Sequence, residues 1–179
     1  PKLLNADLVF QGNKLSLRKA IFERFLNPIA SEADNVRRGG RLSDDTPMSA
    51  IFFGPPGTSK TQLARLISEY LEWPLVQVDP SYLVQEGLDR VQAMANKLFN
   101  MFTLAEQVVV LLDEFDELGR NREGNEDMLS RFITTAMLPK LASINSERKI
   151  VFLLATNYVS QFDAAFRRGG RFDMLVQIM

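Results

Sequence analysis

The chain has 179 residues, of which 46% are hydrophobic and 24% are charged. These values are typical of one globular domain with a sizeable core, and the length argues against two domains. The net charge of −1 gives no general attraction for nucleic acid or for anionic membranes. The sequence has neither cysteine nor histidine. Disulfides and thiolate metal sites are therefore excluded, and acid–base chemistry must rely on carboxylates.

Two further expectations concern location and completeness. No apolar run approaches the ~20 residues that a membrane-spanning helix needs, and the first residues do not read as a signal peptide. We therefore expect a cytoplasmic protein with no membrane segment in this chain. Because the chain starts at Pro1 and stops at Met179, directly after a strand-like segment, we expect a fragment of a longer protein.

The first predicted helix is amphipathic and follows a short apolar piece at residues 8–10. Ser16 is its expected N-cap, and it is expected to end before Pro28. Its apolar face comprises Leu17, Ile21, Phe22, Phe25 and Leu26. Residues 30–47 have little apolar content and are predicted to form a surface connection.

A strand, a tight loop and a helix follow. Residues 48–53 are predicted to form a buried strand, and residues 62–71 carry apolar side chains at helical spacing. The loop and the first helical residue together are Gly54, Pro55, Pro56, Gly57, Thr58, Ser59, Lys60, Thr61 and Gln62. This arrangement indicates a phosphate-binding loop, because unpaired backbone N–H groups and the helix dipole favour an anion there.

Three residues of this loop have specific predicted consequences. We expect Lys60 to reach the β- and γ-phosphates of a nucleotide and Thr61 to place its hydroxyl on Mg²⁺. The usual pattern has glycine immediately before the lysine, but this sequence has Ser59. The Cβ and hydroxyl of Ser59 must therefore fit where glycine lets the backbone approach phosphate closely.

The remaining chain alternates strands with helices. Strands are predicted at residues 75–79, 107–112, 149–155 and 174–178, and helices at 91–102, 128–141 and 163–166. The continuous aliphatic run at 108–112 is typical of a central parallel strand covered on both faces. Together the elements predict an α/β fold in which helices flank a mostly parallel sheet.

Two adjacent carboxylates, Asp113 and Glu114, directly follow the strand at 107–112. Ligands of α/β sheets bind at the carboxyl ends of strands. We therefore expect Asp113 to hold Mg²⁺, directly or through its water shell, and Glu114 to polarise the water that attacks the γ-phosphate. A solvated acidic loop is the alternative for such a pair alone, but a phosphate loop at another strand end favours catalysis. Asp116 and Glu117 are interpreted as residues that shape or solvate the loop.

Asn157 follows the strand at 149–155. Its amide can hydrogen-bond both the attacking water and a γ-phosphate oxygen. A strand-end asparagine is often only a turn former. Its place beside the other two strand ends favours the functional interpretation.

These motifs, in this order, resemble the core of AAA+ ATPases, specifically the AAA group with a second region of homology. Residues 54–61 resemble its Walker A loop with one change, 111–114 its Walker B motif and 155–157 its sensor 1. Residues 168–173 resemble the segment that supplies arginine fingers. The resemblance covers nearly the whole chain, from about residue 8 to residue 178.

The resemblance implies a P-loop NTPase three-layer sandwich around a five-stranded parallel sheet. Residues 1–179 would be the nucleotide-binding α/β subdomain, and the family's helical lid would be absent from this chain. ATP and Mg²⁺ are the implied cofactors, with ATP bound at a subunit boundary of a homo-oligomeric ring that is commonly hexameric. Arg168 aligns with the finger that reaches a neighbour's γ-phosphate and Arg171 with the second arginine, while Arg167 is a bystander. A solvated basic cluster is the alternative for these arginines.

Residues 81–87 differ from the aromatic-hydrophobic-glycine loop with which many AAA remodellers grip a polypeptide. Gly87 is present, but Gln85 and Glu86 precede it. Tyr82 or Leu83 are alternatives from a shifted position, and local packing of Tyr82 explains it equally well. Substrate threading is therefore less strongly indicated than ATP hydrolysis.

The resulting hypothesis is an Mg-dependent ATPase that works as an oligomeric ring and remodels a macromolecular partner, expected to be a protein. Ser59 and the atypical loop motivate an alternative from the binding class, a slow or inactive nucleotide-dependent assembly switch or scaffold. A third hypothesis is work on DNA such as clamp loading. The lack of a basic stretch counts against nucleic acid.

Overall fold

The computed structural model describes residues 7–10, 13–16, 19, 21–38, 43–79, 81–84, 90–114, 137–157 and 172–178. The helices and strands are, in chain order, β1 (Asp7–Phe10), β2 (Asn13–Ser16), η2 (Phe22–Leu26), α2 (Asn27–Arg37), β3 (Ser49–Phe53), α3 (Lys60–Leu71), β4 (Leu75–Val78), α4 (Ser81–Val84), α5 (Val91–Thr103), β5 (Val109–Leu112), α8 (Leu138–Glu147), β6 (Val151–Thr156) and β7 (Met174–Gln177). Among these described elements, none is a helix with the length and apolarity required to cross a bilayer.

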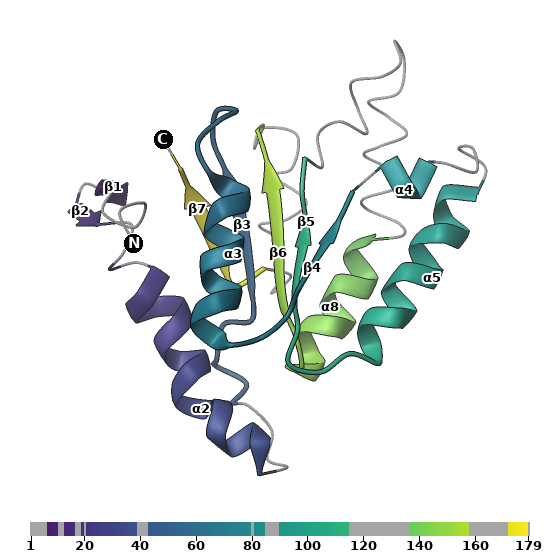
Figure 1. The fold of residues 1–179 in the computed structure, drawn as a ribbon, viewed down its shortest axis with the longest axis horizontal. Coiled ribbons are helices and arrows are strands. Elements are labelled where there is room, and N and C mark those ends of the chain that lie inside the picture. Colours follow the sequence, from purple (N-terminus) through teal and green to yellow (C-terminus); the bar gives the residue numbers. More distant parts are fainter. Residues whose placement is uncertain are drawn as a thin grey trace.

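The centre of the fold is a five-stranded sheet in the order β4-β5-β6-β3-β7. Every pair of neighbours in it is parallel. Figure 1 shows the strands side by side with their carboxyl ends at the same edge. β1 and β2 form a separate antiparallel pair. The predicted parallel α/β sheet is confirmed, and its topology brings the segments after β3, β5 and β6 to one edge.

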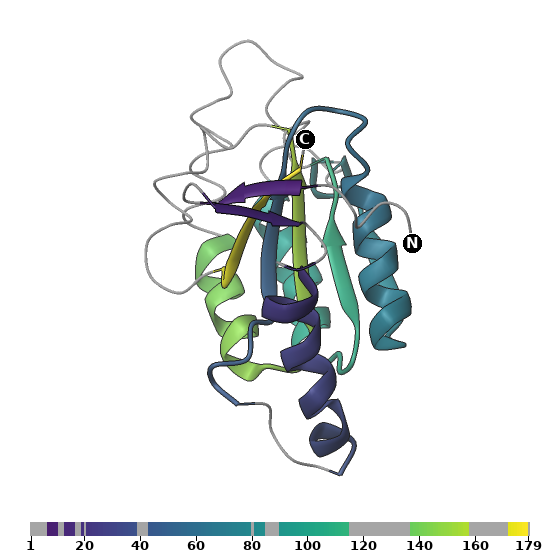
Figure 2. The same cartoon turned by 90° about the vertical axis from the view of Figure 1, so that its left-hand side faces the viewer.

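Two apolar layers cover the sheet. The face of β5 that carries Val109 and Leu111 packs with residues of η2, α2 and α3. Val110 and Leu112 point to the opposite face, toward α5 and α8. Figure 2 shows α3 and α8 on opposite sides of the sheet. All residues of β5 and β6 are buried, as expected of central parallel strands, so the predicted three-layer sandwich is confirmed.

The start of the first helix and its end before Pro28 were predicted wrongly. Ser16 is the last residue of β2 and not a helix cap. The helix passes through the π-helical turn η2, in which the backbone N–H of Asn27 bonds to the carbonyl of Phe22. Pro28 then stands in the first turn of α2, where a residue without an N–H is tolerated. The proline therefore does not end the helix.

The prediction of a surface connection over residues 30–47 was also wrong in its first half. α2 continues to Arg37, and its side chains Ile29 and Val36 pack against the core on the α3 side of the sheet. Residues 43–48 form a connection, although Met48 is fully buried. Most of the helix predicted at 128–141 and all of that at 163–166 lie outside the described residues.

Candidate functional site

The loop between β3 and α3 begins at Gly54, where a side chain cannot be accommodated. A Cβ on Gly54 would lie 1.8 Å from the carbonyl oxygen of Ile178, so only glycine fits beside the segment that follows β7. Gly57 has a φ of +81°, and Ser59 has a φ of +63°. Ser59 therefore adopts the left-handed conformation that glycine reaches without strain. Its exposed side chain makes no capping hydrogen bond to α3.

Lys60 is the first residue of α3 and is buried. Its ammonium donates to the carbonyl oxygens of Gly54 at 2.8 Å and Pro55 at 2.9 Å. It also contacts Thr58 Oγ1 at 3.3 Å and Asn157 Oδ1 at 2.9 Å. The cationic end of the side chain is thus held between the loop and the end of β6, at the N-terminus of a helix.

Asp113 follows β5 and is 8% exposed. Its Oδ2 accepts a hydrogen bond of 2.6 Å from the hydroxyl of Thr61 and one of 3.0 Å from Nε2 of Gln77. Its Oδ1 accepts the backbone N–H of Glu114 at 3.1 Å. These three donors fix the orientation of the carboxylate. Glu114 has a φ of +51° and is exposed, so the chain turns sharply directly after the buried carboxylate.

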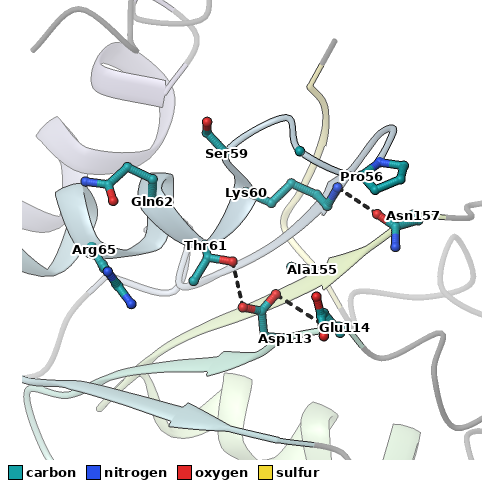
Figure 3. Close-up of a pocket in the computed structure, with 11 residues that line it drawn as sticks. Pro56, Ser59, Lys60, Thr61, Gln62, Arg65, Asp113, Glu114, Ala155 and Asn157 are labelled. Atoms are coloured by element: carbon teal, nitrogen blue, oxygen red, sulfur yellow. Dashed lines mark hydrogen bonds between the residues drawn. The ribbon is translucent and has the colours of Figure 1, made fainter.

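The three strand ends enclose a pocket of about 360 Å³. Its lining comprises Pro56, Gly57, Ser59, Lys60, Thr61, Gln62, Arg65, Asp113, Glu114, Ala155 and Asn157. Figure 3 shows the Lys60 ammonium directed at Asn157, and the Thr61 hydroxyl directed at Asp113. Most of the residues predicted from the sequence therefore lie around one pocket, and Gly54, Pro55 and Thr58 contact Lys60 beside it.

The residues fit a nucleotide and its metal ion. The volume lies within the range of about 300–1,000 Å³ that is usual for small-molecule sites, and a lysine at a helix N-terminus suits phosphate. Thr61 and Asp113 present adjacent oxygen atoms, the ligands that Mg²⁺ prefers; this ion typically takes few protein ligands and completes its shell with phosphates and water. Within the described ranges no group of three or more Asp, Glu, His or Cys side chains is arranged around a metal position.

One residue of the pocket and one residue behind it were not predicted from the sequence. Arg65 lines the pocket from one helical turn beyond Thr61, a spacing that could have indicated it. Gln77 contacts Asp113 from β4, and the only signal was one polar residue within an apolar strand. The predicted fingers Arg168 and Arg171 lie outside the described residues.

The predicted substrate-gripping region is described only in part, since residues 85–89 lie outside the described ranges. Leu83 is 1% exposed and belongs to the core on the α5 side of the sheet, against which Tyr82 packs. Both side chains therefore pack locally. The buried Leu83 is therefore not available at the surface to grip a polypeptide.

Residues 50–179 match the sequence profile of the AAA family, described as the ATPase family associated with various cellular activities. Among curated proteins, 26S proteasome regulatory subunit 8 homolog B of Arabidopsis thaliana is 31% identical over 135 residues, which are 73% of this chain and 32% of the relative. ATPase family gene 2 protein homolog A of Homo sapiens is 29% identical over 135 residues, 74% of this chain and 15% of the relative. The chain thus spans about a third or less of these relatives.

Solved structures are similar as well. The crystal structure of the FIGL-1 AAA domain in complex with ADP has a TM-score of 0.64 and 28% identity, covering 90% of this chain and 51% of that one. A second structure of the FIGL-1 AAA domain has a TM-score of 0.65 and 26% identity, with the same coverage. The similarity therefore extends to the fold over most of the chain.

Proposed function

Because this chain belongs to the AAA family of ATPases, we propose that it binds ATP with Mg²⁺ and hydrolyses it in the pocket at the carboxyl edge of the sheet. The observation that carries the proposal is the convergence of the loop before α3, the Asp113–Glu114 pair and Asn157 on one pocket. A cation, an oxygen pair for a metal, a second carboxylate and an amide can neutralise phosphate charge and position the attacking water in phosphoryl transfer.

Each side chain has one proposed role. Lys60 exchanges its loop carbonyls for the β- and γ-phosphate oxygens, which neutralises charge at the helix N-terminus. Thr61 and Asp113 hold Mg²⁺, which when bound neutralises the charge that develops on the phosphates. Glu114 accepts the proton of the attacking water, and Asn157 donates to a γ-phosphate oxygen.

We further propose that residues 1–179 are the nucleotide-binding subdomain of a protein that works as a homo-oligomeric ring. Arg168 and Arg171 would act on the nucleotide of a neighbouring copy, so that hydrolysis depends on assembly. The similarity to regulatory subunits of the 26S proteasome supports work within an assembly and on a protein partner. The sequence identity between this chain and those subunits is about 30%.

The first experiment measures phosphate release across a series of protein concentrations. We expect turnover that rises with assembly and is lost in Arg168→Ala, with Arg167→Ala as the matched control. No turnover at any concentration, with nucleotide binding retained, would favour the alternative of a nucleotide-dependent assembly switch or scaffold. The left-handed backbone conformation of Ser59 is the structural observation that supports this alternative.

The second experiment separates binding from chemistry. Glu114→Gln is expected to bind ATP with nearly unchanged affinity and to lose at least about 100-fold in turnover, whereas Lys60→Ala is expected to lose binding. Glu106→Gln and Lys97→Ala, at exposed positions away from the pocket, are the matched controls. Full turnover in Glu114→Gln would show that the catalytic assignment is wrong.

A further inference from the structure

Gln77 is the second side chain that holds the Asp113 carboxylate. Its Nε2 donates to Asp113 Oδ2 at 3.0 Å, and the same oxygen accepts the hydroxyl of Thr61 at 2.6 Å. Gln77 belongs to β4, the edge strand beside β5 (Figure 1). It does not line the pocket, so it would act on a nucleotide only through Asp113.

Strand register explains why this residue can reach Asp113. Gln77 is paired with Leu111 across the parallel β4–β5 ladder, and Asp113 lies two residues beyond Leu111, directly after β5. Side chains two residues apart on a strand point to the same face. Gln77 therefore shares the α3 face of the sheet with Asp113, and its two methylene groups span the diagonal distance. Asparagine, one methylene shorter, would not reach.

The two donors on Oδ2 differ in the proposed function. The Thr61 hydroxyl would bind a metal ion through an oxygen lone pair, and its O–H can still donate to Asp113. The Gln77 amide takes no part in the proposed metal site, so of these two donors it is the one that serves only to orient the carboxylate. Because a glutamine amide is neutral, it orients the carboxylate without adding a positive charge that would compete with a cation.

We propose that Gln77 is a positioning residue for the metal–nucleotide site, which together with Thr61 holds the Asp113 carboxylate in the orientation that binds the metal. The proposal rests on the proposed function. It predicts a specific signature, because a hydrogen bond to Asp113 should matter for nucleotide bound with Mg²⁺ and not for nucleotide bound without it. A residue that merely ties β4 to β5 would affect both forms equally.

The test measures the Kd of a fluorescent ADP analogue (mant-ADP) with Mg²⁺ and with EDTA, for the purified protein and its variants. Gln77→Met keeps the length of the side chain and removes the donor, and Gln77→Asn keeps the amide but shortens it. Gln92→Met, at an exposed position on α5, is the matched control. Thermal unfolding of each variant shows whether it is folded. If Gln77→Met does not fold, the test is made with Gln77→Asn.

We expect both Gln77 variants to lower the ratio of the EDTA Kd to the Mg²⁺ Kd by about 10-fold or more, the effect of one hydrogen bond to a charged group. The Kd in EDTA should stay within about twofold, and Gln92→Met should match the unaltered protein. An unchanged ratio, or equal weakening with and without Mg²⁺, would overturn the role of Gln77 while leaving the proposed function intact. No binding by the unaltered protein in either buffer would instead overturn the proposed function, and the role of Gln77 with it.

Discussion

The ammonium of Lys60 lies 2.9 Å from the amide oxygen Oδ1 of Asn157, so the first residue of α3 is bonded directly to the residue that follows β6. This contact assigns a direction to the Asn157 amide, because an ammonium can only donate. The Nδ2 end therefore points away from Lys60, as Figure 3 shows. A donor presented at this strand end is what the proposed contact with a γ-phosphate oxygen requires.

Asn157→Leu should separate catalysis from binding. Lys60 keeps its contacts with Gly54 and Pro55 in this variant, so we expect nucleotide affinity within about threefold of the unaltered protein. Turnover should fall by about 10²-fold or more, as for loss of one donor to a developing charge. Steady-state phosphate release and mant-ADP titration measure the two quantities. Asn100→Leu, on the exposed side of α5, is the control, and undiminished turnover in Asn157→Leu would contradict the assigned role.

Gly54→Ala should be the most damaging single substitution in the loop. The new Cβ would lie 1.8 Å from the backbone oxygen of Ile178, and backbone cannot move aside as a flexible side chain can. We expect a loss of about 3 kcal/mol or more in the free energy of unfolding, measured by chemical denaturation.

Gly57→Ala is the matched control for Gly54→Ala. No atom lies within 4 Å of a Cβ built there, so only the φ of +81° opposes the substitution. The expected loss is about 1–2 kcal/mol. Equal losses in the two variants would show that contact with Ile178 does not restrict the loop.

Ser59→Gly should leave nucleotide binding within about threefold and should not destabilise the protein. The left-handed conformation of Ser59 costs about 1–2 kcal/mol, and glycine would remove this cost. Glycine also has more conformational freedom in the unfolded chain, which opposes the gain. We expect a net change between zero and about 1 kcal/mol of stabilisation. Ser59→Ala isolates the hydroxyl, because it keeps the Cβ. A loss of binding above about tenfold in both variants would mean that the hydroxyl itself is a ligand.

The sheet could be predicted from the sequence because its strands are short, largely apolar runs. The run at 109–112 has no polar residue, so burial on both faces follows from composition alone. The first helix could not be predicted in the same way. Its continuation past Pro28 depends on a π-helical turn, and no residue pattern in the sequence signals that turn.

Residues of the candidate site could be predicted where the proposed chemistry requires a charged or polar side chain. They could not be predicted where contacts between distant segments of the chain determine the residue. The residues at 60, 61, 113, 114 and 157 are charged or polar side chains at strand or helix ends, which made them visible. The contact of Gln77 with Asp113 depends on the register between β4 and β5, which the sequence alone does not reveal. The need for glycine at position 54 likewise arises from the approach of Ile178, which follows β7.

A second carboxylate, Asp173, joins β7 to the rest of the fold. Its Oδ2 accepts the backbone N–H groups of Met48 at 2.8 Å and Ser49 at 3.0 Å, and the Ser49 hydroxyl at 2.8 Å. Its Oδ1 accepts Nδ2 of Asn145 at 3.3 Å. Arg148 is 3.4 Å away and donates mainly to carbonyl oxygens in the segment before β3, at 2.6 Å each.

Asp173→Ala should therefore destabilise the protein mainly through lost backbone hydrogen bonds. Met48 and Ser49 are buried, so their N–H groups would be left without an acceptor, and we expect a loss of about 2–4 kcal/mol. Asp173→Asn retains one acceptor oxygen and should lose less. Chemical denaturation of both variants gives the two values.

A double-mutant cycle identifies which contact of Asp173 matters. At 3.4 Å the ion pair with Arg148 is long, and the Asp173 side chain is 19% exposed, so we expect a coupling energy with Arg148→Met below about 1 kcal/mol. The coupling with Ser49→Ala should be larger, because that hydroxyl donates directly to Oδ2 at 2.8 Å. If the coupling with Arg148 were the larger one, charge pairing and not backbone capping would hold the start of β7 against β3.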